Sequence, residues 1–169
     1  MKTLETARLI IDEITSKDAS FILQMLNDPT FIKYVADRGI RTEEQARAYI
    51  QDRVVASYEE HGFAMGAVRL KDSGEVIGMC GLVNRDTLED IDIGYGFLPK
   101  FRGKGYALEA AVAVMKMGRE DFGLQRLLAI IHPANTASRA LAEKMGMHCE
   151  SMISLTPDED EICLYSWSD

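Results

Sequence analysis

The stretch Phe97-Leu98-Pro99-Lys100-Phe101-Arg102-Gly103-Lys104-Gly105-Tyr106-Ala107 lies between a predicted strand and the start of an amphipathic helix. Its small residues Gly103, Gly105 and Ala107 permit tight turning and let backbone N–H groups approach an anion closely. The unpaired N–H groups at a helix start favour negative charge, and Arg102 and Lys104 add positive potential. The stretch therefore predicts a cradle for a diphosphate or, alternatively, only a tight connection between strand and helix.

Two common phosphate-binding motifs are excluded for this loop. No GxxxxGK[ST] pattern occurs in the chain, so the loop is not a P-loop. A dinucleotide-binding GxGxxG would need a third glycine at position 108, which is Leu108.

Outward from the loop, hydrophobic periodicity and turn residues predict a succession βααβββαβαββ in one domain, residues 1–169. The predicted strands are Arg8–Ile14, Phe63–Leu70, Glu75–Asn84, Asp90–Leu98, Arg126–His132, Met147–Leu155 and Glu161–Trp167. The predicted helices run from Thr15 or Ser16 to the Asn27-Asp28-Pro29 stop, from a capping box at Thr42–Gln45 to His61-Gly62, from about Gly105 to Arg119, and over Asn135–Met145. Gly94 and Gly96 within one strand indicate a bulge or a close backbone approach. The fold class is α+β or α/β with one mixed sheet.

Composition narrows the class of partner. The 169 residues are 47 % hydrophobic and 27 % charged, as in a globular protein, and the formal net charge is −8. An acidic chain is a poor general partner for nucleic acid, because phosphate binding needs a basic face. It suits a cationic partner, although many acidic proteins carry such charge for solubility alone.

Targeting signals and metal motifs are not evident. The longest apolar runs, such as Leu127–Ile131, are far shorter than the roughly 20 residues that span a bilayer. Cys80, Cys149 and Cys163 form no CxxC pair, so we expect three small buried side chains, no metal site and a cytoplasmic location.

Several motifs in order resemble one family. Arg102–Ala107 matches the R/Q-x-x-G-x-G/A motif of GNAT acetyltransferases. The similarity extends over nearly the whole chain and is strongest to the ribosomal-protein alanine N-acetyltransferases (RimJ/RimL-like). It is carried by Thr6-Ala7-Arg8-Leu9-Ile10, Asn27-Asp28-Pro29, Ile93-Gly94-Tyr95, Gly105-Tyr106-Ala107-Leu108-Glu109-Ala110, Asn135-Thr136-Ala137-Ser138 and Glu143-Lys144-Met145-Gly146-Met147.

The resemblance implies an enzyme that transfers acetyl from acetyl-CoA to a primary amine through a tetrahedral intermediate. It implies that two parallel central strands splay apart, here Asp90–Leu98 and Arg126–His132, and receive the pantetheine arm between them. The implied cofactor-binding residues are Phe97, Leu98, Arg102, Gly103, Lys104, Gly105, Tyr106, Ala107, Asn135 and Ser138. A backbone N–H beside the predicted bulge would also bind the developing oxyanion.

The departing thiolate needs a hydrogen-bond or proton donor, because a free thiol has a pKa of about 8.5. Many relatives carry a Tyr for this purpose at the position that is Ala142 here. Ser138 is therefore the candidate acid. Asn135 is a candidate for contact with the pantetheine arm, and the alternative is that it only caps the following helix.

The acceptor amine must lose a proton before it attacks. Asp92 stands where relatives often have Glu and is the first candidate base, acting directly or through a water. Glu89 and Asp90 precede it, and all three also fit a solvated acidic edge. His132 is a further candidate with a structural alternative. Gly96 stands where relatives often have Trp, which would widen the acceptor cleft.

Two other functions stay open at this point. The same fold could hold an acyl-CoA as a sensor without turnover, or the loop could bind another nucleotide. The acceptor is either a protein N-terminal amine or a small-molecule amine, and the chain is expected to act without nucleic acid or membrane, as a monomer or homodimer.

Overall fold

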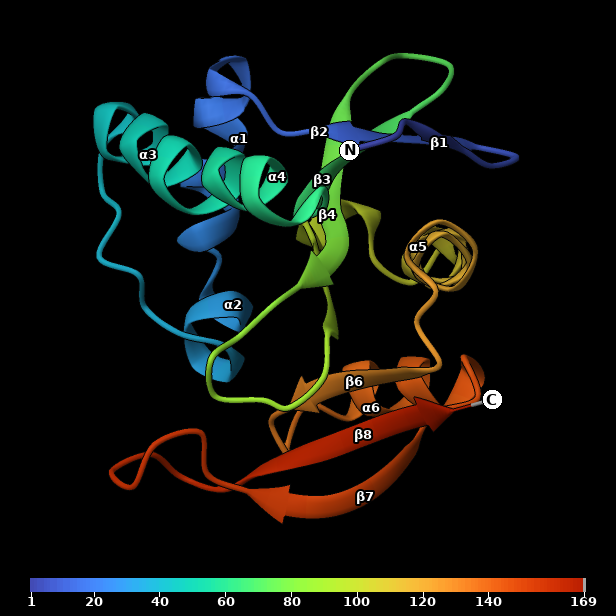
Figure 1. The fold of residues 1–169 in the computed structure, drawn as a ribbon. Coiled ribbons are helices and arrows are strands. Elements are labelled where there is room, and N and C mark those ends of the chain that lie inside the picture. The colour runs from blue at the N-terminus through green and yellow to red at the C-terminus, as the bar shows by residue number, and fades with distance from the viewer. Residues whose placement is uncertain (169) are drawn as a thin grey trace.

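A computed structural model describes residues 1–168 of the chain. Its strands form one eight-stranded mixed sheet in the order β1-β2-β3-β4-β5-β6-β8-β7 (Figure 1). The strands are β1 (Leu4–Glu5), β2 (Leu9–Glu13), β3 (Met65–Leu70), β4 (Val76–Val83), β5 (Asp92–Phe97), β6 (Arg126–Ile131), β7 (His148–Ile153) and β8 (Ile162–Ser168). Only β5 and β6 pair in parallel, and every other neighbouring pair is antiparallel. The predicted mixed sheet is confirmed.

Helices cover the sheet on both sides (Figure 1). They are α1 (Ala19–Leu26), α2 (Pro29–Tyr34), α3 (Glu43–Tyr49), α4 (Ala56–His61), α5 (Tyr106–Phe122) and α6 (Thr136–Lys144). Three short segments accompany them: the 3-10 helices η1 (Ser16–Asp18) and η3 (Pro99–Phe101) and the π-helical η2 (Ile50–Val55). Figure 1 shows α1, α3 and α4 on the opposite side of strands β3 and β4 from α5.

Local signals explain most helix ends. Thr15 forms a reciprocal capping box with Asp18, and Gly62 ends α4 in the left-handed conformation at φ +80°. Thr42 accepts a hydrogen bond from the Gln45 N–H, but Gln45 Oε1 accepts from Arg41 N rather than from Thr42 N. The predicted capping box at Thr42 is therefore only half formed.

Besides the short η3, one strand and one helix were not predicted. Strand β1 is two residues long and adds to the sheet edge beside β2. Helix α2 begins at Pro29, after Asp28, whose carboxylate accepts a hydrogen bond from Phe31 N. Asn27-Asp28-Pro29 thus ends one helix and starts the next, because proline is well suited to the first helical position.

The bulge predicted at Gly94 and Gly96 is wrong. Strands β4 and β5 pair in unbroken register from Val83↔Asp92 to Gly78↔Phe97. A Cβ on Gly94 would lie 3.0 Å from Met65 Sδ, and one on Gly96 would lie 3.4 Å from Met25 Cε. The two glycines give room to methionine side chains rather than bending the strand.

The cysteines divide between core and surface. Cys80 and Cys163 are buried as predicted, but Cys149 is exposed, which corrects the prediction for that residue. Its strand, β7, is the edge of the sheet, and most of its residues are exposed.

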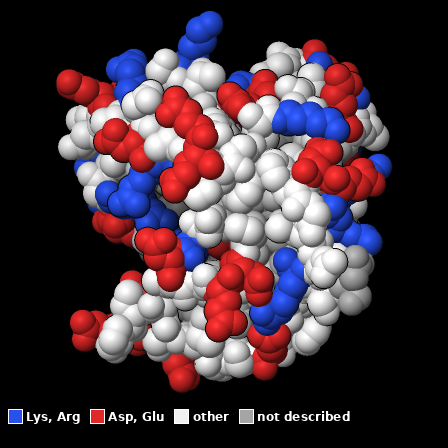
Figure 2. All heavy atoms as spheres, in the orientation of Figure 1, with Lys and Arg blue, Asp and Glu red and all other residues white. Residues whose placement is uncertain are grey.

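Charges on the surface are interspersed. Figure 2 shows acidic and basic groups side by side on one face, around an uncharged zone near its centre. Some form ion pairs, such as Arg126 with Asp90 and Glu150, both at 2.7 Å. Within residues 1–168, no helix is both long and apolar enough to cross a bilayer.

Candidate active site

The sheet opens between β5 and β6. These parallel strands share one bridged pair, Asp92↔Leu128, supported by a hydrogen bond of 3.0 Å from Leu128 N to Ile91 O. Alternation along the strand turns the main-chain N–H and C=O of Tyr95 towards β6, where residues 1–168 offer them no ladder partner. Unpaired backbone groups of this kind need a partner. The separation therefore confirms the predicted splay, without the predicted bulge.

Side chains of β5 alternate between two sides of the sheet. Asp92, Gly94 and Gly96 share one face, and the glycines on it pack against Met65 of β3 and Met25 of α1. Tyr95 points to the other face, where it contacts Ser138 of α6. The strand thus presents a carboxylate on one side and a phenol on the other.

Asp92 is the most unusual ionisable group of the opening. It is 1 % exposed, its Oδ1 accepts a hydrogen bond of 3.0 Å from Arg85 Nε, and its Oδ2 is buried without a hydrogen-bond partner in residues 1–168. Burial raises the pKa of Asp92 to about 6, against the opposing effect of Arg85. The carboxylate can therefore change its protonation near neutral pH.

The other predicted acids lie elsewhere. Glu89 is exposed in the turn before β5 and makes no hydrogen bond or ion pair with residues 1–168. Asp90 also precedes the strand and binds Arg126 Nη1 at 2.7 Å. The structure thus brings only Asp92, of these three, into the sheet.

His132 makes contacts that fit its structural alternative. Its Nδ1 accepts a hydrogen bond of 3.1 Å from Ala134 N, and its ring lies 5.2 Å from the ring of Tyr34 in α2. The histidine shapes the turn after β6 and contacts the helix that faces it.

Ser138 and Tyr95 form a pair across the opening. Ser138 Oγ donates to Tyr95 Oη at 3.0 Å, and Tyr95 Oη donates to the Ser138 carbonyl at 3.0 Å. Burial raises the pKa of Tyr95 to about 12, and the hydrogen bond with Ser138 opposes this. Ala142, one turn further along α6, is fully buried and offers no polar group.

Sequence reasoning assigned no role to Tyr95. Its position in Ile93-Gly94-Tyr95 was noted only as a resemblance. A usable signal was present, because strand alternation places residue 95 on the face opposite Asp92, and the helix lacks its own tyrosine.

Asn135 caps α6, as its alternative reading predicted. Its Oδ1 accepts a hydrogen bond of 3.3 Å from Ser138 N. The side-chain amide NH₂ makes no hydrogen bond within residues 1–168 and so remains able to donate to a ligand.

The glycine loop has the backbone that the sequence predicts. Gly103 and Gly105 adopt φ of +74° and +82°, a region that side chains other than glycine rarely enter. A Cβ on Gly103 would meet no atom within 4 Å, so the loop is open there. Lys104 is exposed, while Tyr106 and Ala107 are half-buried at the start of α5.

Arg102 is engaged by the protein itself. Its Nε donates to the Phe97 carbonyl at 2.9 Å, Nη2 to Asp28 at 2.8 Å and Nη1 to Thr30 Oγ1 at 3.3 Å. Asp28 is buried, at 6 % exposed, while the Arg102 side chain is 38 % exposed. Arg102 thus fastens the loop to α2. Two main-chain groups near the loop are also bonded within the protein: the Phe97 carbonyl accepts from Arg102, and the Leu98 N–H donates to Ile77 O at 3.0 Å.

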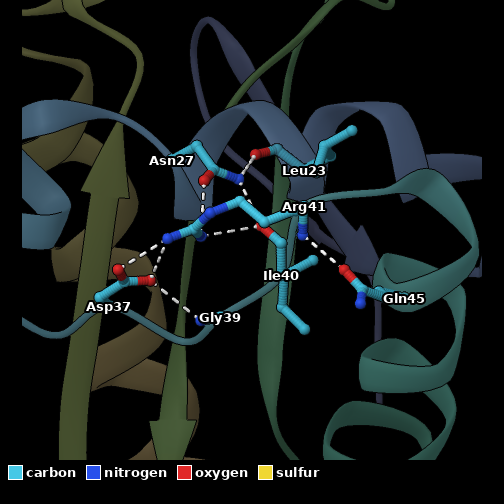
Figure 3. Close-up of polar contacts among 7 residues, drawn as sticks. All are labelled: Leu23, Asn27, Asp37, Gly39, Ile40, Arg41 and Gln45. Carbon is cyan, nitrogen blue, oxygen red and sulfur yellow. Dashed lines mark hydrogen bonds and ion pairs between the residues drawn. The ribbon is translucent and has the colours of Figure 1, made fainter.

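The loop between α2 and α3 is held by one arginine (Figure 3). Arg41 Nη2 donates to Asp37 Oδ1 at 2.9 Å and to Asp37 Oδ2 at 2.7 Å. Arg41 Nη1 donates to Asn27 Oδ1 at 2.9 Å. Asn27 Nδ2 donates to the carbonyls of Leu23 and Ile40, both at 2.8 Å. The loop that follows α2 is therefore tied to the end of α1 by side chains rather than by sheet or helix.

Comparison with known proteins identifies this arrangement. A sequence profile described as an acetyltransferase (GNAT) domain matches residues 8–148. The chain belongs to the GNAT acetyltransferase family. It is 31 % identical over 147 residues to the uncharacterized N-acetyltransferase YnaD of Bacillus subtilis, an alignment that covers 87 % of this chain and 83 % of that one. This acetyltransferase is thus an acetyl-CoA-dependent acyltransferase by family.

Solved structures share its fold. A GNAT-family acetyltransferase from Bacillus anthracis superposes with a TM-score of 0.81 at 27 % identity and covers 99 % of this chain and 98 % of its own. RimL, a ribosomal L7/L12 alpha-N-protein acetyltransferase in complex with coenzyme A, superposes with a TM-score of 0.84 at 16 % identity, over 99 % and 98 % of the two chains. The second likeness is one of fold.

Proposed function

We propose that this acetyltransferase, acting as one domain, moves the acetyl group of acetyl-CoA to a primary amine by direct attack of the amine. Strand β5 carries the proposal. Where β5 leaves β6, the buried Asp92 lies on the α1 side of the sheet and the Tyr95–Ser138 pair lies on the α6 side. A proton acceptor and a hydrogen-bond donor so placed suit acyl transfer between two ligands.

The residues of the opening fit acetyl-CoA, which would supply an activated thioester. The unpaired main chain of Tyr95 suits an amide-bearing arm, and residues 102–107 with Lys104 suit its diphosphate. The Phe97 carbonyl and the Leu98 N–H are already bonded within the protein, so we propose that Tyr95 pairs with the arm beside Phe97 and Leu98, which would contribute the Phe97 N–H and the Leu98 carbonyl. Arg102 serves by holding the loop, and the Asn135 amide is free to donate to the arm.

Asp92 is proposed as the base. An amine is protonated in water at neutral pH and must lose its proton before it can attack. Asp92 Oδ2 is the free acceptor, and because it is buried we propose that one intervening water relays the proton. An α-amine, with a pKa of about 7.7–8.0, lies closer to the pKa of Asp92 than a lysine near 10.4. This favours a protein N-terminal amine over a lysine side chain, with a small-molecule amine as the second class of acceptor.

Ser138 is proposed to stabilise the departing thiolate. Its hydrogen now points to Tyr95, but hydroxyl hydrogens rotate freely. When Tyr95 donates to Ser138 Oγ instead of the Ser138 carbonyl, the Ser138 hydrogen is released to the sulfur. The neutral phenol suits this task, since burial keeps the pKa of Tyr95 well above neutral pH.

Binding is the first test. We expect micromolar acetyl-CoA binding by isothermal calorimetry, with none for ATP or NAD, and its loss in Gly105→Glu. Gly123→Glu is the control, because Gly123 also has positive φ but lies at the other end of α5, away from the glycine loop. Equal loss in both variants, or no binding by folded wild type, would refute the cofactor assignment.

Turnover is the second test. Mass spectrometry of a panel of N-terminal peptides, polyamines and amino acids should show acetylation by wild type that Asp92→Asn lacks. Acetyl-CoA binding without acetylation of any amine would instead favour a sensor that holds acyl-CoA.

A further inference from the structure

Two motifs of the sequence that the proposed chemistry does not use lie against each other. Thr6 and Arg8 precede β2, and Glu109 lies in the first turn of α5, about a hundred residues later. Glu109 Oε1 accepts from Thr6 Oγ1 at 2.6 Å and from Arg8 N at 2.8 Å, and Oε2 accepts from Arg8 Nε at 2.7 Å. The start of the sheet is thus clamped to the start of α5.

The clamp orients the Arg8 guanidinium over the glycine loop. Besides the bond from Nε to Glu109, Nη1 donates to the Lys104 carbonyl at 3.0 Å, and the guanidinium carbon lies 4.4 Å from the centre of the Tyr106 ring. Nη2 makes no hydrogen bond with residues 1–168 and lies 3.3 Å from where a Cβ on Gly105 would be. The side chain is 46 % exposed, so this NH₂ group faces solvent beside the loop.

Glu109 is charged and fixed. Its side chain is 18 % exposed. Partial burial raises the pKa of Glu109, but the hydrogen bonds from Thr6 and Arg8 outweigh that effect and hold its pKa below the ordinary value. Its negative charge offsets the field of Arg8, so Arg8 can contribute to anion binding only through an oriented contact.

Arg102, the motif arginine, is turned towards α2 instead, with its three nitrogens each bonded once, to Phe97, Asp28 and Thr30. We propose that Arg8, oriented by Glu109, binds the diphosphate of the cofactor through Nη2, beside the N–H groups of the glycine loop. This inference rests on the proposed acetyl-CoA site and adds a residue from outside the loop to it. A guanidinium that is held at Nε and Nη1 and free at Nη2 suits a single phosphate oxygen.

Calorimetry with three ligands tests the contact: CoA, dephospho-CoA, which lacks the 3′-phosphate, and pantetheine, which lacks all phosphates and is titrated by NMR at millimolar concentration. Arg8→Gln should weaken CoA and dephospho-CoA alike by about 10- to 100-fold, as expected for one charged hydrogen bond, and leave pantetheine unchanged. Glu109→Gln should weaken the same two ligands by a smaller factor, because the guanidinium loses its orientation. Arg47→Gln, which removes another ion-paired surface arginine, is the control without effect.

The other outcomes overturn the inference. Unchanged CoA affinity in Arg8→Gln removes the contact, while absence of CoA binding in wild type refutes the proposed function itself. A loss with CoA but not dephospho-CoA refutes the diphosphate assignment. Tighter CoA binding by Glu109→Gln would show that the charge of Arg8 acts through its field, without an oriented contact. An equal loss of pantetheine affinity in Arg8→Gln would show that Arg8 has a purely structural role. Should Arg8→Gln not fold, Arg8→Lys carries the same test, because lysine lacks the planar fork.

Discussion

Replacement of Asp92 by Asn should change how the stability of the protein depends on pH. Burial raises the pKa of Asp92 from 3.8 to about 6 in the folded state. The folded protein therefore holds the proton more tightly than the unfolded chain, and stability falls as pH rises between these two values. Each pKa unit is worth about 1.4 kcal/mol, so ionisation of Asp92 costs about 3 kcal/mol by pH 8, of which about 2 kcal/mol accrues above pH 4.5. The residue is almost fully buried, so solvent screening reduces this little.

Urea unfolding of wild type and Asp92→Asn at pH 4.5 and pH 8 measures the effect. Asn keeps an acceptor for Arg85 but leaves a buried NH₂ unpaired, which costs about 1–3 kcal/mol at both pH values. The informative quantity is thus how the difference in free energy of unfolding between Asp92→Asn and wild type changes with pH. From pH 4.5 to pH 8 this difference should shift by about 2 kcal/mol in favour of the variant. A constant difference would refute the raised pKa. With an acceptor in hand, wild-type kcat/KM should also rise with pH through about 6, because Asp92 can accept a proton only when it is ionised.

Three further predictions concern the contacts around the opening. Tyr95→Phe should lower kcat about 10-fold in wild type but hardly at all in Ser138→Ala, with the Kd of acetyl-CoA unchanged; additive losses in this double-mutant cycle would contradict the pairing. Asp28→Ala should lower the free energy of unfolding by about 1–3 kcal/mol in thermal or urea unfolding, because it removes the cap of α2 and the carboxylate that pairs with the partly exposed Arg102, and a change below about 0.5 kcal/mol would count against that role. Arg41→Ala should lower the free energy of unfolding by about 1 kcal/mol or less in urea unfolding, since the pair with Asp37 is exposed; a loss above about 2 kcal/mol would show that the bond to Asn27 holds the loop more strongly than the exposed pair implies.

The sequence predicted the features that depend on residues close together in the chain. The strand–loop–helix unit around Gly103 and Gly105, the caps at Thr15 and Asn135 and the stop at Gly62 all depend on neighbours within a few residues. Their geometry follows from hydrogen bonds that the chain makes with itself nearby, so pattern reasoning found them. The family resemblance then supplied the splay of β5 and β6, which no local pattern encodes.

What the sequence missed depends on contacts between distant segments. The bond between Tyr95 and Ser138 joins residues 43 apart, and that between Arg102 and Asp28 joins residues 74 apart. Basic residues in a glycine loop predict positive potential, but only the fold shows that Arg102 is bonded to Asp28 and Thr30 at the start of α2. Gly94 and Gly96 suggested a bulge or a close backbone approach because a glycine within a strand has several possible causes, and the methionine side chains that pack against them come from β3 and α1.

The six residues of β5 carry one further consequence, for how such a protein changes over evolutionary time. Positions 94 and 96 border the α1 side and position 95 the α6 side, so in the proposed site substitutions at alternate positions would affect different ligands. Replacing Gly96 would press on the flexible tip of Met25 and reshape the proposed acceptor side while the Tyr95–Ser138 pair stays in place. With the site as proposed, one short strand would let the choice of amine diverge while the acetyl donor is kept.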